Sequence, residues 1–126
     1  MRLQFPKSAL ALLILSVLLL ADCAPVPLTE VEIPFTGESV LNAIEGETYR
    51  YFRYKTVEEA QADVAKVAPD GKEIAGKRMR WEGPVHIYYL QKRIVIYVGS
   101  NPKVISAIGQ VFGPQVAGDA IEAEPL

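Results

Sequence analysis

Apolar residues in the middle of the chain switch between strand-like and helix-like spacing. Residues 48–54 are rich in aromatic side chains and predict a strand. Thr56 is a good helix N-cap, and Glu59 follows three residues later, as in a capping box. Apolar residues then recur at helical spacing at Val57, Ala60, Val64, Val67 and Ala68. A Pro-Asp-Gly turn at 69–71 ends this predicted helix.

Three further strands are predicted after this turn. Residues 73–81 alternate, with Ala75, Met79 and Trp81 on one side. Val85–Leu90 and Arg93–Val98 also alternate, and only two residues, at 91–92, join them. Neither of these is Gly or Asn, the residues that favour tight hairpins, so we expect a longer or bulged turn.

A second helix is predicted after residue 99. Ser100 or Asn101 can cap it, and Pro102 suits the first turn, where its missing N–H is not needed. An apolar stripe follows at Val104, Ile105, Ile108, Val111 and Phe112. Gly113 and Pro114 end this helix.

The predicted order is strand, helix, three strands, helix. Short consecutive strands favour antiparallel pairing, and two single-stripe helices need a sheet to cover. We therefore expect an α+β fold: a two-layer sandwich of about four antiparallel strands, with both helices on one face. The expected division is a signal peptide (1–22), an anchor and acidic, proline-containing spacer (23–47), the α+β domain (48–113) and an acidic tail (114–126). Within the spacer, residues 39–44 are expected to form a helical turn, and residues 31–35 an edge strand.

The N-terminal segment has the features of an export signal. Arg2 and Lys7 precede residues 9–21, an apolar run interrupted only by Ser16. Its thirteen residues match the apolar core of a signal peptide and fall short of the ~20 residues that span a bilayer. The pattern predicts an exported protein.

The run ends at Leu20, Ala21, Asp22 and Cys23. This resembles the lipobox of bacterial lipoproteins, although Asp22 stands where that family has a small uncharged residue. The resemblance implies cleavage before Cys23, diacylglycerol on its thiol, and anchoring to the outer side of a bacterial membrane. Cys23 is the only cysteine, so no internal disulfide competes for it. The alternative is ordinary cleavage nearby and a secreted protein without lipid.

The body also resembles a group of small exported bacterial proteins without assigned function. The likeness rests on short motifs at residues 54–60, 69–71, 97–99 and 113–115. These are mostly turns and caps, and they imply no chemistry.

Charge is unevenly distributed along the chain. Residues 24–47 contain five acids and no base, whereas residues 48–103 contain eleven Lys and Arg against six Asp and Glu. A mildly basic body between acidic flanks is either a solvated surface or a face that meets anionic headgroups or cell-wall polymers.

The residue set offers little for catalysis. His86 is the only histidine, and the only cysteine lies at the predicted anchor. A nucleophile needs an adjacent base, and a metal site needs several ligands. We therefore expect a non-enzymatic binding module with no metal and no cofactor. A small hydrolase that uses His86 as a base is the alternative.

The expected contact surface is an aromatic and basic sheet face. Arginine interleaved with aromatics suits stacking against sugars or a protein partner. The residues of this predicted surface are Tyr49, Tyr51, Arg53, His86 and Tyr88. The expected partners are the membrane, through lipid at Cys23, and an envelope protein or glycan. Export argues against nucleic acid, and the oligomeric state stays open.

Overall fold

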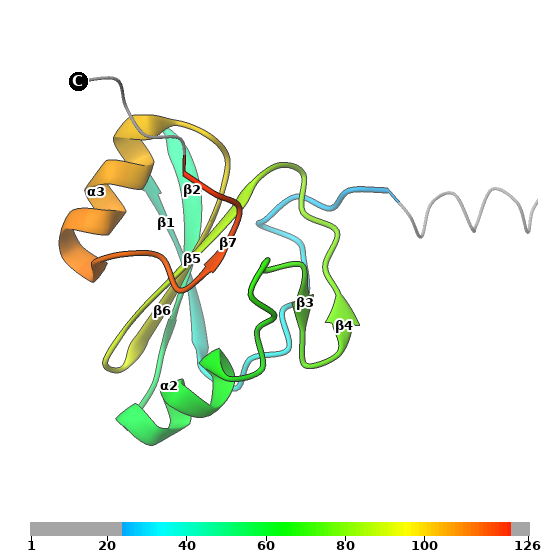
Figure 1. Cartoon of the computed structure of the whole chain (residues 1–126), viewed down its shortest axis with the longest axis vertical. Coiled ribbons are helices and arrows are strands. Elements are labelled where there is room, and N and C mark those ends of the chain that lie inside the picture. Colours follow the sequence, from blue (N-terminus) through cyan, green and yellow to red (C-terminus); the bar gives the residue numbers. More distant parts are fainter. Residues whose placement is uncertain (1–23, 122–126) are drawn as a thin grey trace, which may run out of the picture.

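The computed structural model describes residues 24–121, and its centre is a five-stranded antiparallel sheet (Figure 1). The strand order across the sheet is β1-β2-β6-β5-β7. These strands are β1 (Glu38–Ile44), β2 (Glu47–Arg53), β5 (Val85–Leu90), β6 (Arg93–Val98) and β7 (Ala117–Gly118). A separate two-stranded sheet pairs β3 (Glu73–Ile74) with β4 (Lys77–Arg78). The described helices are α2 (Val57–Val64) and α3 (Pro102–Phe112).

The predicted four-stranded, two-layer sandwich is wrong, because both faces of the sheet are covered (Figure 1). Ala60 of α2 packs with Phe52, Ile87 and Ile94 on one face. The opposite face packs against α3 through a second cluster, formed by Tyr88, Val95, Tyr97, Val104 and Ile108. The two helices therefore lie on opposite sides of the sheet, and seven short strands replace the predicted four.

Both faces of the five-stranded sheet are buried because of the residues that make up β5 and β6. In β6, Ile94 and Ile96 point to the α2 side, while Val95 and Tyr97 point to the α3 side, and all four are at most 1% exposed. Alternation normally separates an apolar face from a solvated one. Here both sets of alternating residues are large and mostly apolar, so each face buries area and each requires a cover.

Both helices begin at the capping residues that the sequence predicts. The Thr56 hydroxyl accepts from the backbone N–H of Glu59 at 3.2 Å, so α2 begins where its predicted N-cap lies. Asn101 caps α3 by accepting from the N–H of Lys103 at 3.0 Å. Gly113 ends α3 with φ 82°, a backbone conformation that is unfavourable for residues with a side chain.

Turn chemistry explains two differences from the predicted strands. The β5–β6 connection is a tight two-residue turn, since Leu90 pairs with Arg93, and Gln91 takes the positive φ (56°) that such a turn needs. The single strand expected over 73–81 is instead the β3–β4 hairpin. Ala75 and Gly76, with φ 53° and 78°, reverse the chain there.

The region expected as a spacer contributes to the fold. The helical turn expected at 39–44 is wrong, because these residues lie in β1, which pairs with all of β2. Further upstream, Val31 is 7% exposed and packs against Ile74 and Met79. In the region expected as a tail, Ala117 is buried, and β7 pairs with β5.

A buried carboxylate fastens residues 24–37 to the domain. Asp63 in α2 is 1% exposed and accepts from the Thr36 N–H at 2.6 Å and the Thr36 hydroxyl at 3.1 Å. The Tyr54 hydroxyl and Lys66 Nζ donate to it at 2.6 and 2.8 Å. Burial alone would raise the pKa of Asp63, but these hydrogen bonds outweigh it and hold that pKa below its ordinary value.

Arg50 provides a second attachment for the same segment. Its Nη1 donates to the carbonyl of Leu28 at 3.1 Å and to that of Val31. Its guanidinium also lies 5.5 Å from the ring centroid of Phe52. A side chain of β2 thus satisfies backbone carbonyls of a segment that has no regular secondary structure.

Neither of the helices in residues 24–121 could span a membrane.

We expect Asp63→Asn to lower the free energy of unfolding by about 3 kcal/mol, because the donors of Thr36, Tyr54 and Lys66 lose a buried, charged acceptor. Urea denaturation measures this loss. The matched control is Glu58→Gln, which makes the same chemical change at an exposed position of α2. Equal stabilities of the two variants would contradict this role for Asp63.

The same interaction predicts the direction of a pH effect. A carboxyl group whose pKa is lower in the folded state stabilises the protein above its unfolded pKa of about 4, and this contribution is lost as the pH falls through the folded value. We expect the stability difference between wild type and Asp63→Asn to shrink below pH ~4. A series of urea denaturations across this range checks it, and a constant difference would contradict it.

Candidate binding surface

All five residues of the predicted surface lie on the α3 side of the sheet. Strand β6 lies between β2 and β5, and directly opposed residues in antiparallel strands point to the same face. The cross-strand rows are Tyr49–Tyr97–His86 and Tyr51–Val95–Tyr88. In the next row, Arg53 is opposite Arg93.

His86 belongs to the interior and not to an accessible surface. It is 2% exposed, and its ring stacks near Tyr97 with centroids 6.2 Å apart. Nδ1 lies 2.8 Å from Gln115 Oε1, and Nε2 lies 3.1 Å from the Gly99 carbonyl. The first contact attaches the segment after α3 to the sheet, and the second joins His86 to the residue that follows β6. Within residues 24–121, its hydrogen-bond partners are an amide and a carbonyl and include no nucleophile.

Tyr88 is also covered by α3. It is 1% exposed and packs with Val104 and Ile108 of the helix. Its hydroxyl finds no hydrogen-bond partner among the described residues, and burial raises the pKa of Tyr88. His86 and Tyr88 are therefore too deeply buried to belong to a contact surface.

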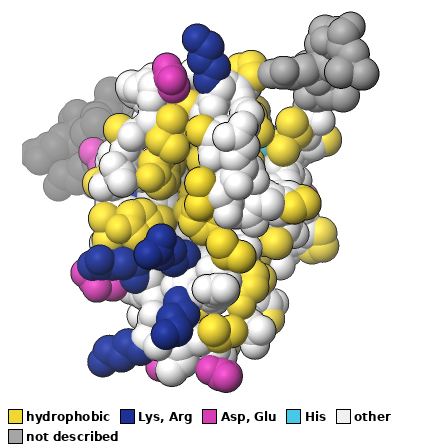
Figure 2. Space-filling view, turned by 90° about the vertical axis from the view of Figure 1, so that its left-hand side faces the viewer, with side chains coloured by type: hydrophobic (Ala, Val, Ile, Leu, Met, Phe, Trp, Pro, Cys, Tyr) yellow, Lys and Arg dark blue, Asp and Glu magenta, His cyan; other side chains and the backbone are white. Residues whose placement is uncertain are grey.

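Helix α3 leaves one end of this sheet face uncovered, next to the β5–β6 turn. We call this area the sheet patch. It consists of Glu38, Val40, Tyr51, Arg53, Leu90 and Arg93. Leu90 is 42% exposed, Arg53 and Arg93 are exposed, and Val40 and Tyr51 are half-buried. Figure 2 shows this side of the molecule, with Lys and Arg side chains beside hydrophobic ones in its lower part.

The sheet patch has one paired and one unpaired cation. Arg53 Nη2 donates to Glu38 Oε1 at 2.7 Å, and this hydrogen bond raises the pKa of Arg53. Such an exposed pair adds little stability. Arg93 makes no side-chain ion pair or hydrogen bond within the described part of the chain. The patch thus offers a free guanidinium next to a tyrosine and a leucine.

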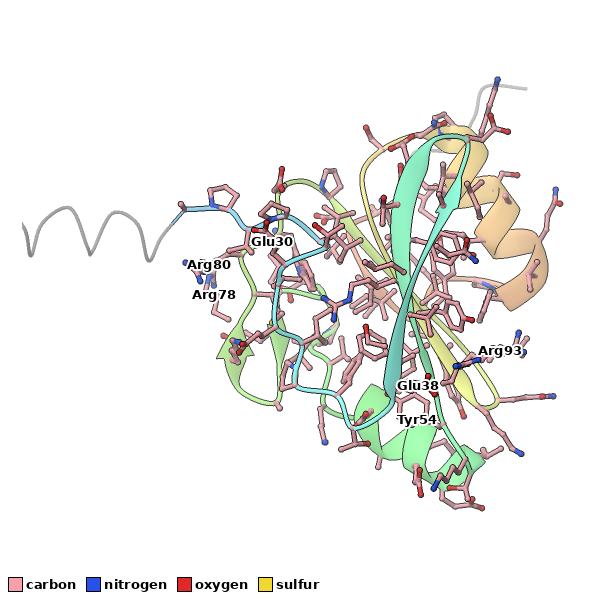
Figure 3. The ribbon with its side chains drawn as sticks, turned by 180° about the vertical axis from the view of Figure 1, so that it is seen from behind. Glu30, Glu38, Tyr54, Arg78, Arg80 and Arg93 are labelled. Atoms are coloured by element: carbon pink, nitrogen blue, oxygen red, sulfur yellow. The ribbon has the colours of Figure 1, made fainter. Side chains whose placement is uncertain are left out.

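An open cavity of about 490 Å³ adjoins the sheet patch at Glu38 and Arg53. Lys55 and Glu59 contribute further charges to its lining. The hydroxyl of Tyr54, which also lines it, is already bonded to Asp63. Figure 3 shows Glu38 and Tyr54 close together at this end of the sheet.

Strand β1 gives the patch a free edge. It lies at the border of the five-stranded sheet, and most of its seven residues are exposed. Asn42 Oδ1 accepts the backbone N–H of Ala43 at 2.9 Å, while Leu41 beside it is 49% exposed. An exposed edge of this length can accept another extended chain by backbone pairing.

A polar network positions α3 over the covered part of this face. Tyr97 Oη donates to Glu47 Oε1 at 2.7 Å and accepts from the Asn101 N–H at 3.2 Å. Burial, together with the hydrogen bond to Glu47, raises the pKa of Tyr97 to about 12. Sequence reasoning found Asn101 as a cap but missed Glu47, because that contact joins residues fifty positions apart.

Within residues 24–121, no three His, Cys, Asp or Glu side chains gather in a way that would hold a metal ion.

Comparison with protein-family models, curated proteins and solved structures finds no match to this chain.

We expect two conservative variants on the α3 side to behave differently. Tyr88→Phe removes an unpaired buried hydroxyl, so stability should stay the same or rise by up to about 1 kcal/mol. Tyr97→Phe removes the donor to Glu47 and should cost about 1–2 kcal/mol. Denaturant unfolding of both variants measures this contrast. A destabilised Tyr88→Phe would show that its hydroxyl has a partner.

Proposed function

We propose that this protein is a lipid-anchored binding module on the outer side of a bacterial membrane. In this proposal, diacylated Cys23 holds the domain at the bilayer. The sheet patch and the β1 edge bind an extended segment of an envelope protein.

The anchor is supported by the residues around Cys23. An export-type apolar run precedes it, no second cysteine competes for it, and Val26, three residues later, already bonds to the domain. A free thiol in an exported protein is a liability, whereas acylation gives it a use. Two or more acyl chains suffice for stable attachment, while a single chain does not.

The binding role is supported chiefly by the free β1 edge beside the exposed row of the sheet patch. Backbone pairing along an edge supplies affinity, and neighbouring side chains supply specificity. Leu41 and Leu90 offer apolar contacts, Tyr51 an aromatic ring, and Arg93 a charge. A hydrolase based on His86 receives no comparable support, since its ring is buried among structural contacts.

The anchor is tested by the intact mass of the mature protein isolated from membranes. We expect an N-terminal Cys23 with diacylglycerol, and we expect Cys23→Ser to leave the membrane fraction. A mass that corresponds to an unmodified thiol, or an N-terminus beyond residue 23, would overturn it.

The binding surface is tested by site-specific photo-cross-linking in intact cells, with the cross-linker at Leu41. We expect a discrete product that falls at least fivefold when Tyr51→Ala and Arg93→Ala are combined, because both residues belong to the sheet patch that continues inward from this edge. The matched controls are Lys103→Ala on α3 and a cross-linker at the exposed Val111. A product that does not depend on Tyr51 and Arg93 would place the contact elsewhere.

A further inference from the structure

Strand β1 lacks the features that normally keep edge strands from pairing with one another. Such strands are protected by lysine, proline, a β-bulge or an inward-pointing charge. Strand β1 contains no lysine, arginine or proline, and its seven residues pair with β2 without a bulge. Its single charged residue, Glu38, lies at one end and is bonded to Arg53. At its centre, Leu41 is 49% exposed. The edge is therefore open to another strand along its length.

The outer side of β1 presents the backbone groups of alternate residues. In an antiparallel sheet, alternate residues of an edge strand direct their N–H and C=O groups away from the neighbouring strand. Ile44 flanks the two-residue turn to Glu47, so its backbone groups face β2. The N–H of Ala43, the next residue inward, bonds to the side chain of Asn42. The outward-facing set therefore consists of Ser39, Leu41 and Ala43.

A second copy of β1 fits this edge about a two-fold axis that passes beside Leu41. In an antiparallel pair with this centre, Leu41 lies opposite Leu41 of the second copy, and the outward backbone groups of the two strands meet. The two exposed leucine side chains then remove each other from water. The opposed pairs are Leu41 with Leu41, Ser39 with Ala43, Val40 with Asn42, and Glu38 with Ile44.

This register brings no like charges directly opposite each other, an arrangement that would destabilise a strand pair. Glu38 lies opposite Ile44 of the second copy. The next acid along the chain, Glu45, lies opposite Gly37. The edge is thus compatible in charge with a second copy of itself.

The two-fold axis also brings both chain entries to the same side. An axis between antiparallel strands of one continuous sheet is perpendicular to that sheet, so the same face of each copy points in the same direction. Leu28, Ile33 and Phe35 of the entering segment pack on the α2 side. Cys23 is three residues from Val26, a reach of at most about 11 Å. Both proposed anchors are therefore tethered close to one side of the pair, as attachment to one bilayer requires.

We propose that β1 pairs with β1 of a second copy and joins two five-stranded sheets into one. The pairing rests on the proposed function for the edge as a binding site, and it adds regulation of that site. A partner segment must replace the second copy before it can bind, because both use the same backbone groups. Lipid anchors confine both copies to one surface and raise their effective concentration, so a small interface suffices.

The pairing is tested by disulfide trapping of the full chain in intact cells. Leu41→Cys puts two thiols beside the two-fold axis, where the Cα atoms of a hydrogen-bonded pair are about 5.5 Å apart, within the range of a disulfide. We expect oxidation to give at least ten times more covalent dimer from Leu41→Cys than from Val111→Cys, whose position on α3 is 64% exposed. The wild-type chain measures any contribution from Cys23.

The register is tested with Ser39→Cys and Ala43→Cys, which lie opposite each other across the axis. Two copies of either residue alone are about 14 Å apart, because four residues of a strand separate them. We expect two coexpressed chains that carry these changes to form dimer, and either variant alone to form at least fivefold less. Equal yields would overturn the two-fold pairing.

Leu41→Lys should block the pairing, because it brings two ammonium groups together at the axis. Added to the Ser39→Cys and Ala43→Cys chains, it should lower the dimer yield at least fivefold. The matched control is Leu90→Lys, the same change at an exposed leucine of β5, and it should leave the yield unchanged.

The pairing and the proposed function fail separately. A dimer yield from Leu41→Cys that does not exceed that from Val111→Cys, or that ignores Leu41→Lys, would overturn the pairing. In the photo-cross-linking experiment, the second copy is recognised by a product of twice the mass, and the partner segment by a product that depends on Tyr51 and Arg93. The second product without the first refutes only the pairing. A Leu41→Cys dimer with an unacylated Cys23 refutes only the anchor.

Discussion

A single buried carboxylate holds together parts of the chain that local structure would leave separate. Asp63 accepts hydrogen bonds from Thr36 in the entering segment, from Tyr54 directly after β2, and from Lys66 shortly after α2. The carboxylate remains charged in the interior because these donors outweigh the cost of its burial. Without it, residues 24–37 would lose their main polar attachment to α2.

Because residues 24–37 are attached to the domain, an anchor at Cys23 would hold the domain close to the membrane. A free spacer of some twenty residues would let the domain move far from the membrane. Here Arg50 and Asp63 fasten the segment, and Val26 is bonded to Arg80, so the domain begins almost directly after Cys23. In the proposed function, only a short stretch of chain therefore joins the anchor to the domain.

The binding surface is set by how much of the sheet α3 covers. Tyr97, Glu47 and Asn101 fix the start of the helix over one end of the sheet face. The helix has eleven residues and packs on Tyr88, but it leaves Arg53 and Arg93 exposed. The boundary between core and sheet patch is thus a consequence of helix length and position.

The sequence alone determined the features that depend on neighbouring residues. These are strands β2, β5 and β6, both helix starts, and the placement of Tyr49, Tyr51, Arg53, His86 and Tyr88 on one sheet face, because alternation and caps act over a few positions. Tertiary structure decided which of these residues are buried, that both sheet faces are covered, and that residues 38–44 form an edge strand. Those outcomes depend on contacts such as Thr36 with Asp63 and Glu47 with Tyr97, which join distant positions and leave no periodic signal in the chain.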